Sequence, residues 1–177
     1  GLSRAMDYFE TDPQIDAKKV AVFGISRLGK TVLWTGVRDE RFGMVIASCG
    51  GEGGAALSRR NYGENIDHMT HPTRYFYQFA GNWRNYRDDF NKSPVDAHML
   101  VALMAPRPLL LQTGLTDYWS DPKGEFLSAV AAEPVGKAHQ RIEMFGANLV
   151  VLYRILRLKN LLPSTPESRF FLAESDY

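Results

Sequence analysis

Residues 18–31 have the sequence KKVAVFGISRLGKT, and this stretch predicts a buried strand, a tight turn and then a helix. Val20 to Phe23 is a short, continuous apolar run, which is typical of a strand buried on both faces of a parallel sheet. Arg27 to Arg38 follows, with its apolar residues near helical spacing. Ser26 therefore falls on the turn between the strand and the helix.

Two chemistries fit this turn. In an α/β-hydrolase, a serine on a strand-to-helix turn is the exposed nucleophile, and the N–H of the next residue, here Arg27, donates to the developing oxyanion. The usual pattern is G-x-S-x-G, whereas the second glycine here, Gly29, comes one residue late. By itself, the pattern around Ser26 is a weak signal for a hydrolase.

The second chemistry is phosphate binding, because residues 24–31 also satisfy the P-loop pattern G-x-x-x-x-G-K-[ST]. Lys30 would contact the terminal phosphates and Thr31 a magnesium ion. A P-loop also requires an acidic residue at the end of another strand. The apolar runs at Phe42–Ala47 and Leu109–Gln112 end without one. A P-loop nucleotide-binding protein therefore stays as the alternative to a hydrolase.

Composition excludes several other classes. The chain has 177 residues, enough for one domain, and is 45% hydrophobic and 23% charged, as soluble globular proteins are. Its net charge of +1 gives no electrostatic case for binding nucleic acid. One cysteine excludes an internal disulfide framework. No signal peptide is visible, and the first residue is glycine rather than methionine, so we expect an N-terminal segment to be missing.

Short apolar strands alternate with helices along the chain, which predicts an α/β fold with a parallel sheet and flanking helices. Residues 58–94 have little clean periodicity, and we interpret them as an insertion of short helices and loops. The predicted strands are Val20–Phe23, Phe42–Ala47 and Leu109–Gln112, and the predicted helices are Leu2–Phe9, Arg27–Arg38, Asp96–Met104 and Gly124–Ala132.

The C-terminal stretch differs in character. Residues 141–162 are apolar with interspersed Arg and Lys, and they carry too many charges to span a bilayer. A helix facing the core is favoured over an amphipathic helix on a membrane surface, because apolar stripes usually face a core.

A hydrolase turn predicts an acid after a later strand and then a histidine. Asp117 lies five residues beyond the strand at Leu109–Gln112, where a hydrolase presents its acid. Alone, an aspartate in this position is more typical of a turn, but together with Ser26 it becomes a candidate acid. His139 is the only histidine after Asp117 and is the candidate base, although it comes early.

Several motifs carry a family resemblance. The chain resembles the glucuronoyl esterases of carbohydrate esterase family 15, especially their bacterial branch, over about residues 1–135. In that family the serine is followed by Arg and, two residues later, by Gly-Lys, which accounts for the late glycine. The matching stretches are GISRLGK at 24–30, DERF at 39–42, GGAALSRR at 53–60, PVDAHML at 94–100, APRP at 105–108 and DYWSDP at 117–122.

The resemblance implies a role for each matching residue. Ser26 would be the nucleophile, and Arg27 would stabilise the oxyanion with its backbone N–H and its guanidinium. Lys30 and Glu64 would hydrogen-bond the sugar, and Trp119 would pack against the glucuronoyl ring. Without the resemblance, the two charged residues would be interpreted as solvated surface charges and the tryptophan as a core residue.

The acid varies within the family, since some members carry a glutamate on the loop after the strand that follows the nucleophile helix. Alignment of the glycine-rich run places Cys49 at that position, with Glu52 three residues further on. Asp117 is therefore the first candidate for the acid and Glu52 the second.

These expectations combine into a partial α/β-hydrolase domain over residues 1–135, without the family's first strands, followed by a divergent tail over residues 136–177. Its parent would be secreted or periplasmic and would cleave 4-O-methyl-glucuronoyl esters that link xylan to lignin, with no metal, cofactor, membrane or nucleic acid. An acetyl xylan esterase or a non-catalytic carbohydrate-binding remnant stays open. The family's histidine segment is not recognisable here, so we expect little esterase activity from this chain.

Overall fold

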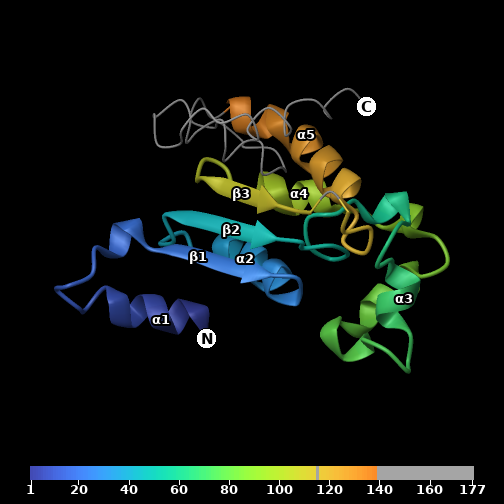
Figure 1. The fold of residues 1–177 in the computed structure, drawn as a ribbon, viewed down its shortest axis with the longest axis horizontal. Coiled ribbons are helices and arrows are strands. Elements are labelled where there is room, and N and C mark those ends of the chain that lie inside the picture. The colour runs from blue at the N-terminus through green and yellow to red at the C-terminus, as the bar shows by residue number, and fades with distance from the viewer. Residues whose placement is uncertain (115, 139–177) are drawn as a thin grey trace.

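In the computed structural model, residues 1–114 and 116–138 are described, and they form a parallel sheet with helices around it (Figure 1). The strands are β1 (Ala21–Ile25), β2 (Met44–Ser48) and β3 (Leu109–Gln112). The α-helices are α1 (Leu2–Phe9), α2 (Arg27–Arg38), α3 (Ile66–Thr70), α4 (Ala97–Ala102) and α5 (Pro122–Ala138). This arrangement confirms the predicted α/β class.

The three described strands lie in the order β1-β2-β3, and both pairs are parallel. Val45 of β2 is in register with Val22 on one side and with Leu109 on the other. All three arrowheads point to the same edge of the sheet, and α3 lies beyond that edge (Figure 1). Parallel α/β sheets place their functional loops at this carboxyl edge.

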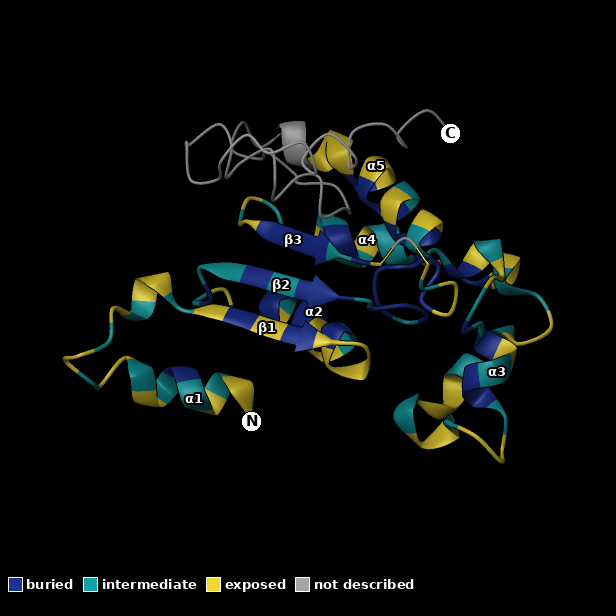
Figure 2. Ribbon diagram, in the orientation of Figure 1, coloured by how far each residue is buried: buried dark blue, intermediate teal, exposed yellow. Residues whose placement is uncertain are grey.

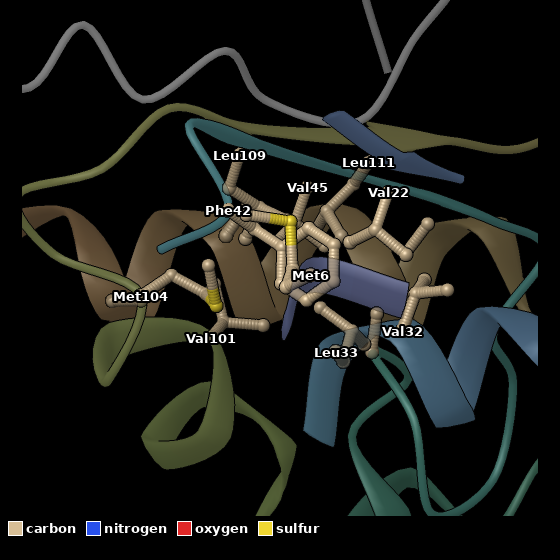
Figure 3. Packing of buried hydrophobic residues seen from close by; sticks show 14 residues of the cluster. Met6, Val22, Val32, Leu33, Phe42, Val45, Val101, Met104, Leu109 and Leu111 are labelled. Carbon is tan, nitrogen blue, oxygen red and sulfur yellow. The ribbon is translucent and has the colours of Figure 1, made fainter. Parts of the chain in front are cut away.

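One hydrophobic cluster joins the sheet to its helices (Figure 3). Met6 of α1 and Leu33 of α2 are fully buried in it, and Val45 of β2 is also fully buried. Burial of a side chain of this size stabilises a fold by roughly 1.5–3 kcal/mol. The cluster therefore fixes α2, and with it the turn before α2, against the sheet.

The expectation that the first strand is buried on both faces is wrong. The β1 residues alternate between exposed and buried, and Phe23 and Ile25 are 54% and 53% exposed (Figure 2). Gly24 lies on the buried face, against Val32 of α2. Among the described residues, α2 covers one face of β1, and the face that carries Phe23 and Ile25 stays exposed.

The last described helix also differs from its prediction. α5 continues to Ala138 and contains Pro134, whereas we expected an end at Ala132. A proline inside a helix removes the hydrogen bond to the carbonyl four residues earlier, here that of Val130. Burial in α5 extends to Ala132, whereas Glu133, Pro134 and Val135 are exposed, so burial does not account for the continuation of the helix past Ala132.

Residues 58–94, which we interpret as an insertion, form short helices and loops. Two buried aspartates hold its first turn, since Arg59 forms an ion pair with Asp96 and Arg60 forms one with Asp121. The 3₁₀ helices of the insertion are Ser58–Arg60, Phe76–Gln78, Gly81–Tyr86 and Phe90–Lys92, and a further one at Ala17–Lys19 precedes β1.

None of the described helices is both long and apolar enough to cross a membrane. The helix predicted over 141–162 lies outside the described residues.

Gly24→Ala should destabilise the fold, because a Cβ at this position would lie 2.3 Å from the carbonyl oxygen of Leu28, a backbone atom that cannot move aside cheaply. We expect a loss of about 1–3 kcal/mol in the free energy of unfolding, measured by urea denaturation. Gly81→Ala is the matched control, because a Cβ there meets no atom within 4 Å. Equal stability of the two variants would show that the contact between β1 and α2 is not tight.

Candidate active site

Ser26 occupies a strained position between β1 and α2. Its backbone has φ 56° and ψ −121°, a conformation that residues with a side chain rarely adopt. The Ser26 N–H donates to the carbonyl oxygen of Ser48 at 2.8 Å, which fixes the turn to the end of β2. An exposed serine on such a turn is the arrangement of a nucleophile elbow in α/β-hydrolases.

Two glycines allow this close approach. A Cβ at Gly29 would lie 2.8 Å from the carbonyl oxygen of Ser48, and one at Gly24 would clash with α2. Because Gly29 lies in the first turn of α2, it packs against the end of β2 although it comes one residue later than in the usual pattern. The late glycine is therefore compatible with an elbow.

Arg27 is the first residue of α2, and both Ser26 and Arg27 are exposed. The first N–H groups of a helix have no partner within it, and the helix dipole adds positive potential at this end. Backbone N–H groups at this end of a helix can donate to an anion that forms nearby.

Lys30 and Glu64 form a buried ion pair beside the elbow. The Lys30 ammonium donates to a carboxylate oxygen of Glu64 and, at 2.6 Å, to the carbonyl oxygen of Gly50. The two side chains are only 13% and 7% exposed. Their interpretation as solvated surface charges is therefore wrong.

The same geometry disfavours the P-loop. A P-loop needs a loop whose amides wrap phosphates before the lysine. Here α2 begins at Arg27, so Gly29, Lys30 and Thr31 all lie inside a helix. The Thr31 hydroxyl donates to the carbonyl oxygen of Arg27 at 3.0 Å, within the helix. The turn therefore does not have the loop geometry of a P-loop.

Trp119 lies next to Glu64, and the two residues are joined through the backbone. The Glu64 N–H donates to the carbonyl oxygen of Trp119 at 2.7 Å. Gly63 has φ 65°, and a Cβ there would lie 2.3 Å from the same oxygen. The indole is 42% exposed and packs edge-on against His68, with 4.6 Å between ring centroids. Trp119 is therefore not a core residue.

These residues line one open pocket of about 80 Å³. The structure brings together four of the predicted site residues there, namely Ser26, Arg27, Lys30 and Glu64, with Trp119 as a fifth. The insertion supplies three further lining residues that the sequence did not single out, Met69, Tyr75 and Gln78. Their segment has no regular periodicity, so no sequence signal pointed to them.

Asp117 does not line the pocket but is held at the carboxyl edge of the sheet. The N–H of Ser120 donates to its carboxylate at 3.3 Å, and the Ser120 hydroxyl donates to the carbonyl oxygen of Cys49 at 3.4 Å. Burial raises the pKa of Asp117, but hydrogen bonds from Ser120 and Cys49 outweigh it and leave the pKa below the usual value. Asp117 is therefore ionised at neutral pH.

Glu52, the second candidate acid, has the opposite character. It is buried, and it accepts a hydrogen bond from the hydroxyl of Ser58. Burial raises the pKa of Glu52 to about 7, and the nearby carboxylate of Asp96 adds to this, although Ser58 and Lys30 oppose it. Glu52 is therefore largely protonated below neutral pH.

The candidate base, His139, lies outside the described residues. Within residues 1–114 and 116–138, no histidine lines the pocket. Among these same residues, no group of three or more His, Cys, Asp or Glu side chains is placed to hold a metal ion.

A parallel α/β sheet with a serine at positive φ between β1 and α2 defines the fold class as that of the α/β-hydrolases. The sequence matches the family described as glucuronyl esterase, fungi, over residues 1–139. This chain belongs to the glucuronoyl esterase family.

Two sequence relatives and two solved structures agree with this assignment. A carbohydrate esterase from an unknown prokaryotic organism is 53% identical over 135 residues, covering 76% of this chain and 31% of the relative. The 4-O-methyl-glucuronoyl methylesterase 1 of Phanerochaete chrysosporium is 34% identical over 146 residues, covering 78% of this chain and 31% of the relative.

Among solved structures, a promiscuous CE15 esterase from a marine bacterial metagenome superposes with a TM-score of 0.74 at 52% identity, covering 77% of this chain and 34% of the other. A glucuronoyl esterase from Solibacter usitatus superposes with a TM-score of 0.71 at 50% identity, covering 76% and 34%. The chain spans about a third of the length of these relatives.

The buried Glu52 should make stability fall with rising pH. Its pKa of about 7 lies above the ordinary 4.5, so the folded chain binds more protons than the unfolded chain between these pH values. The free energy of unfolding therefore decreases as the pH rises from about 5 to 8, with Glu52 contributing about 3 kcal/mol.

Urea denaturation of the unsubstituted chain and of Glu52→Gln at several pH values measures this contribution. The amide cannot ionise, so the variant should lose this part of the decrease. The lowered pKa of His68 acts in the opposite direction, and it is present in both proteins. Identical pH dependence in the two proteins would show that Glu52 is not protonated in the fold.

Proposed function

We propose that this chain carries the nucleophile and the sugar-binding pocket of a serine hydrolase that cleaves glucuronoyl esters. The observation that carries this proposal is the placement of Ser26, at positive φ on the turn between β1 and α2, in the same pocket as the Lys30–Glu64 pair. Relatives of the chain are named 4-O-methyl-glucuronoyl methylesterases, which supports this substrate class.

In the proposed reaction, the Ser26 hydroxyl oxygen attacks the ester carbonyl carbon and gives up its proton to a solvent water, because no histidine lines the described pocket. The carbonyl oxygen becomes an oxyanion, which accepts a hydrogen bond from the N–H of Arg27. Collapse of this intermediate expels the alcohol, which takes up a proton, and leaves an acyl group on Ser26. Water then attacks the acyl carbon by the same route and releases the uronic acid.

The pocket accounts for the uronoyl part of the substrate. Lys30 and Glu64 together present hydrogen-bond donors and acceptors, which suits vicinal sugar hydroxyls. The half-exposed ring of Trp119 offers a flat apolar face to a sugar ring. The natural substrate that we propose is a glucuronoxylan or lignin–carbohydrate ester, encountered outside the cell or in the periplasm.

Between the two candidate acids, we propose Asp117. A triad acid must be ionised to stabilise the imidazolium that forms during catalysis. The pKa of Asp117 is lowered, whereas the pKa of Glu52 is raised to about 7 and its carboxyl group is taken up by Ser58. Charge state and hydrogen bonding both support Asp117.

Hydrolysis of methyl 4-O-methyl-glucuronate by the purified chain tests the proposal. Because no histidine lines the described pocket, we expect slow turnover, about 10³-fold above the uncatalysed rate, from the oxyanion donor and substrate binding. Ser26→Ala should abolish the covalent route while leaving ester binding intact, as measured by product chromatography and by calorimetric titration. Because a slow rate that rests on the oxyanion donor and on binding would survive in Ser26→Ala, the deciding readout is covalent labelling of Ser26 by a fluorophosphonate. Failure of Ser26 to label would overturn the proposal.

Trp119→Ala should weaken binding of the ester about 10-fold, because the sugar loses its apolar platform. Calorimetric titration in the Ser26→Ala background measures this without turnover. Trp34→Ala is the matched control, since Trp34 is 58% exposed on α2 and does not line the pocket. Equal affinity of the two variants would remove Trp119 from the sugar site.

A further inference from the structure

Glu125 is a fully buried carboxyl group that has no role in the reaction proposed above. It lies in the first turns of α5 with 0% exposure. One of its carboxyl oxygens accepts the N–H of Gly51 at 2.9 Å, a contact between residues 74 positions apart in the chain. A buried acidic group is costly unless its hydrogen bonds are needed, so this contact calls for a reason.

The reason lies in what Gly51 and its neighbour touch. The carbonyl oxygen of Gly50 accepts the ammonium of Lys30 at 2.6 Å. Gly51 has φ 55°, and a Cβ there would lie 2.2 Å from a carboxylate oxygen of Glu64. The turn at Gly50 and Gly51 therefore lies directly against both members of the ion pair that lines the pocket.

We infer that Glu125 is a positioning residue for the Lys30–Glu64 pair. Its carboxyl oxygen accepts the Gly51 N–H, and this contact fixes the turn at Gly50 and Gly51. The turn then positions the Lys30 ammonium and the Glu64 carboxylate where the sugar binds. Glu125 thus sets affinity for the uronoyl part of the ester, not the reactivity of Ser26. This inference rests on the proposed function, whose sugar site it deepens.

The protonated form of the Glu125 carboxyl group can fill this positioning role. Burial raises its pKa to about 7, against the opposing hydrogen bonds from the Gly51 and Gly50 amides. A protonated carboxyl group still has a carbonyl oxygen that accepts one N–H. The carboxamide of glutamine keeps the carbonyl acceptor and nearly the same shape. Methionine keeps the volume of the side chain but has no such acceptor.

Titration of the 177-residue Ser26→Ala chain with methyl 4-O-methyl-glucuronate separates these variants. Glu125→Met should weaken binding about 10-fold, because the Gly51 N–H loses its acceptor and the turn shifts. Glu125→Gln should bind the ester with an affinity within about 2-fold of that of the Ser26→Ala chain with Glu125 intact. In the chain with Ser26 intact, the labelling rate of Ser26 by a fluorophosphonate should be the same for all variants.

Ser128→Ala is the matched control. Ser128 is also fully buried on α5, and its hydroxyl has no hydrogen-bond partner in the described part of the chain, so its loss probes packing alone. We expect no change in affinity. The inference would be overturned if Glu125→Met bound the ester as tightly as the Ser26→Ala chain without a further substitution. It would also be overturned if Glu125→Met, Glu125→Gln and Ser128→Ala all lost the same affinity.

A second measurement needs no ligand. NMR can follow the amide hydrogen-exchange rate of Gly51 and the chemical shift of the Lys30 side chain. Both should change in Glu125→Met and stay unchanged in Glu125→Gln and Ser128→Ala. If the chain without a substitution at Glu125 binds no ester, but the Gly51 and Lys30 signals change in Glu125→Met as expected, the proposed function fails and the positioning role stands. If the signals do not change, the positioning role fails whatever the chain binds.

Discussion

The absence of a side chain at Gly24 is the constraint on which the site depends. It lets β1 and α2 approach until the backbone of one nearly touches the backbone of the other. The chain must then turn sharply within one residue, and Ser26 takes the strained conformation that this requires. Everything presented by the start of α2, including the N–H of Arg27 and the ammonium of Lys30, is placed by that contact.

The opposite side of the pocket is built from loops that follow β2 and β3. Three buried carboxyl groups, Glu52, Glu64 and Glu125, lie around the single ammonium of Lys30, as the contacts and their pKa shifts indicate. Several carboxylates in a poorly solvated site cannot all ionise at moderate cost. The fold accommodates them by keeping Glu64 in the ion pair, while the pKa values of Glu52 and Glu125 rise to about 7.

Sequence predicted the parts of this protein that are governed by local rules. The helix at Arg27–Arg38 and the strand at Leu109–Gln112 were predicted with the bounds that the structure gives them. Burial of β1 was predicted wrongly, because an apolar run does not tell how many faces of a strand are covered. The end of α5 was also misplaced, since the helix continues through Pro134 to Ala138.

The candidate site shows the same division. Ser26, Lys30, Glu64 and Trp119 were singled out through a turn pattern and a family resemblance, and the structure brings them into one pocket. Their roles remain predictions. Glu125 was not singled out, because its partner is a backbone N–H that is distant in the chain and leaves no mark on the sequence. Met69, Tyr75 and Gln78 were missed because contacts of irregular segments follow no period.

The pocket joins two parts that are under different constraints. The elbow is fixed by backbone contacts that tolerate almost no substitution, whereas the facing wall comes from short 3₁₀ turns and one short helix in the insertion. Ion pairs with the buried Asp96 and Asp121 attach that insertion at Arg59 and Arg60, outside the pocket lining. The wall that follows these anchors in the chain can therefore change its side chains without disturbing the backbone contacts that hold Ser26.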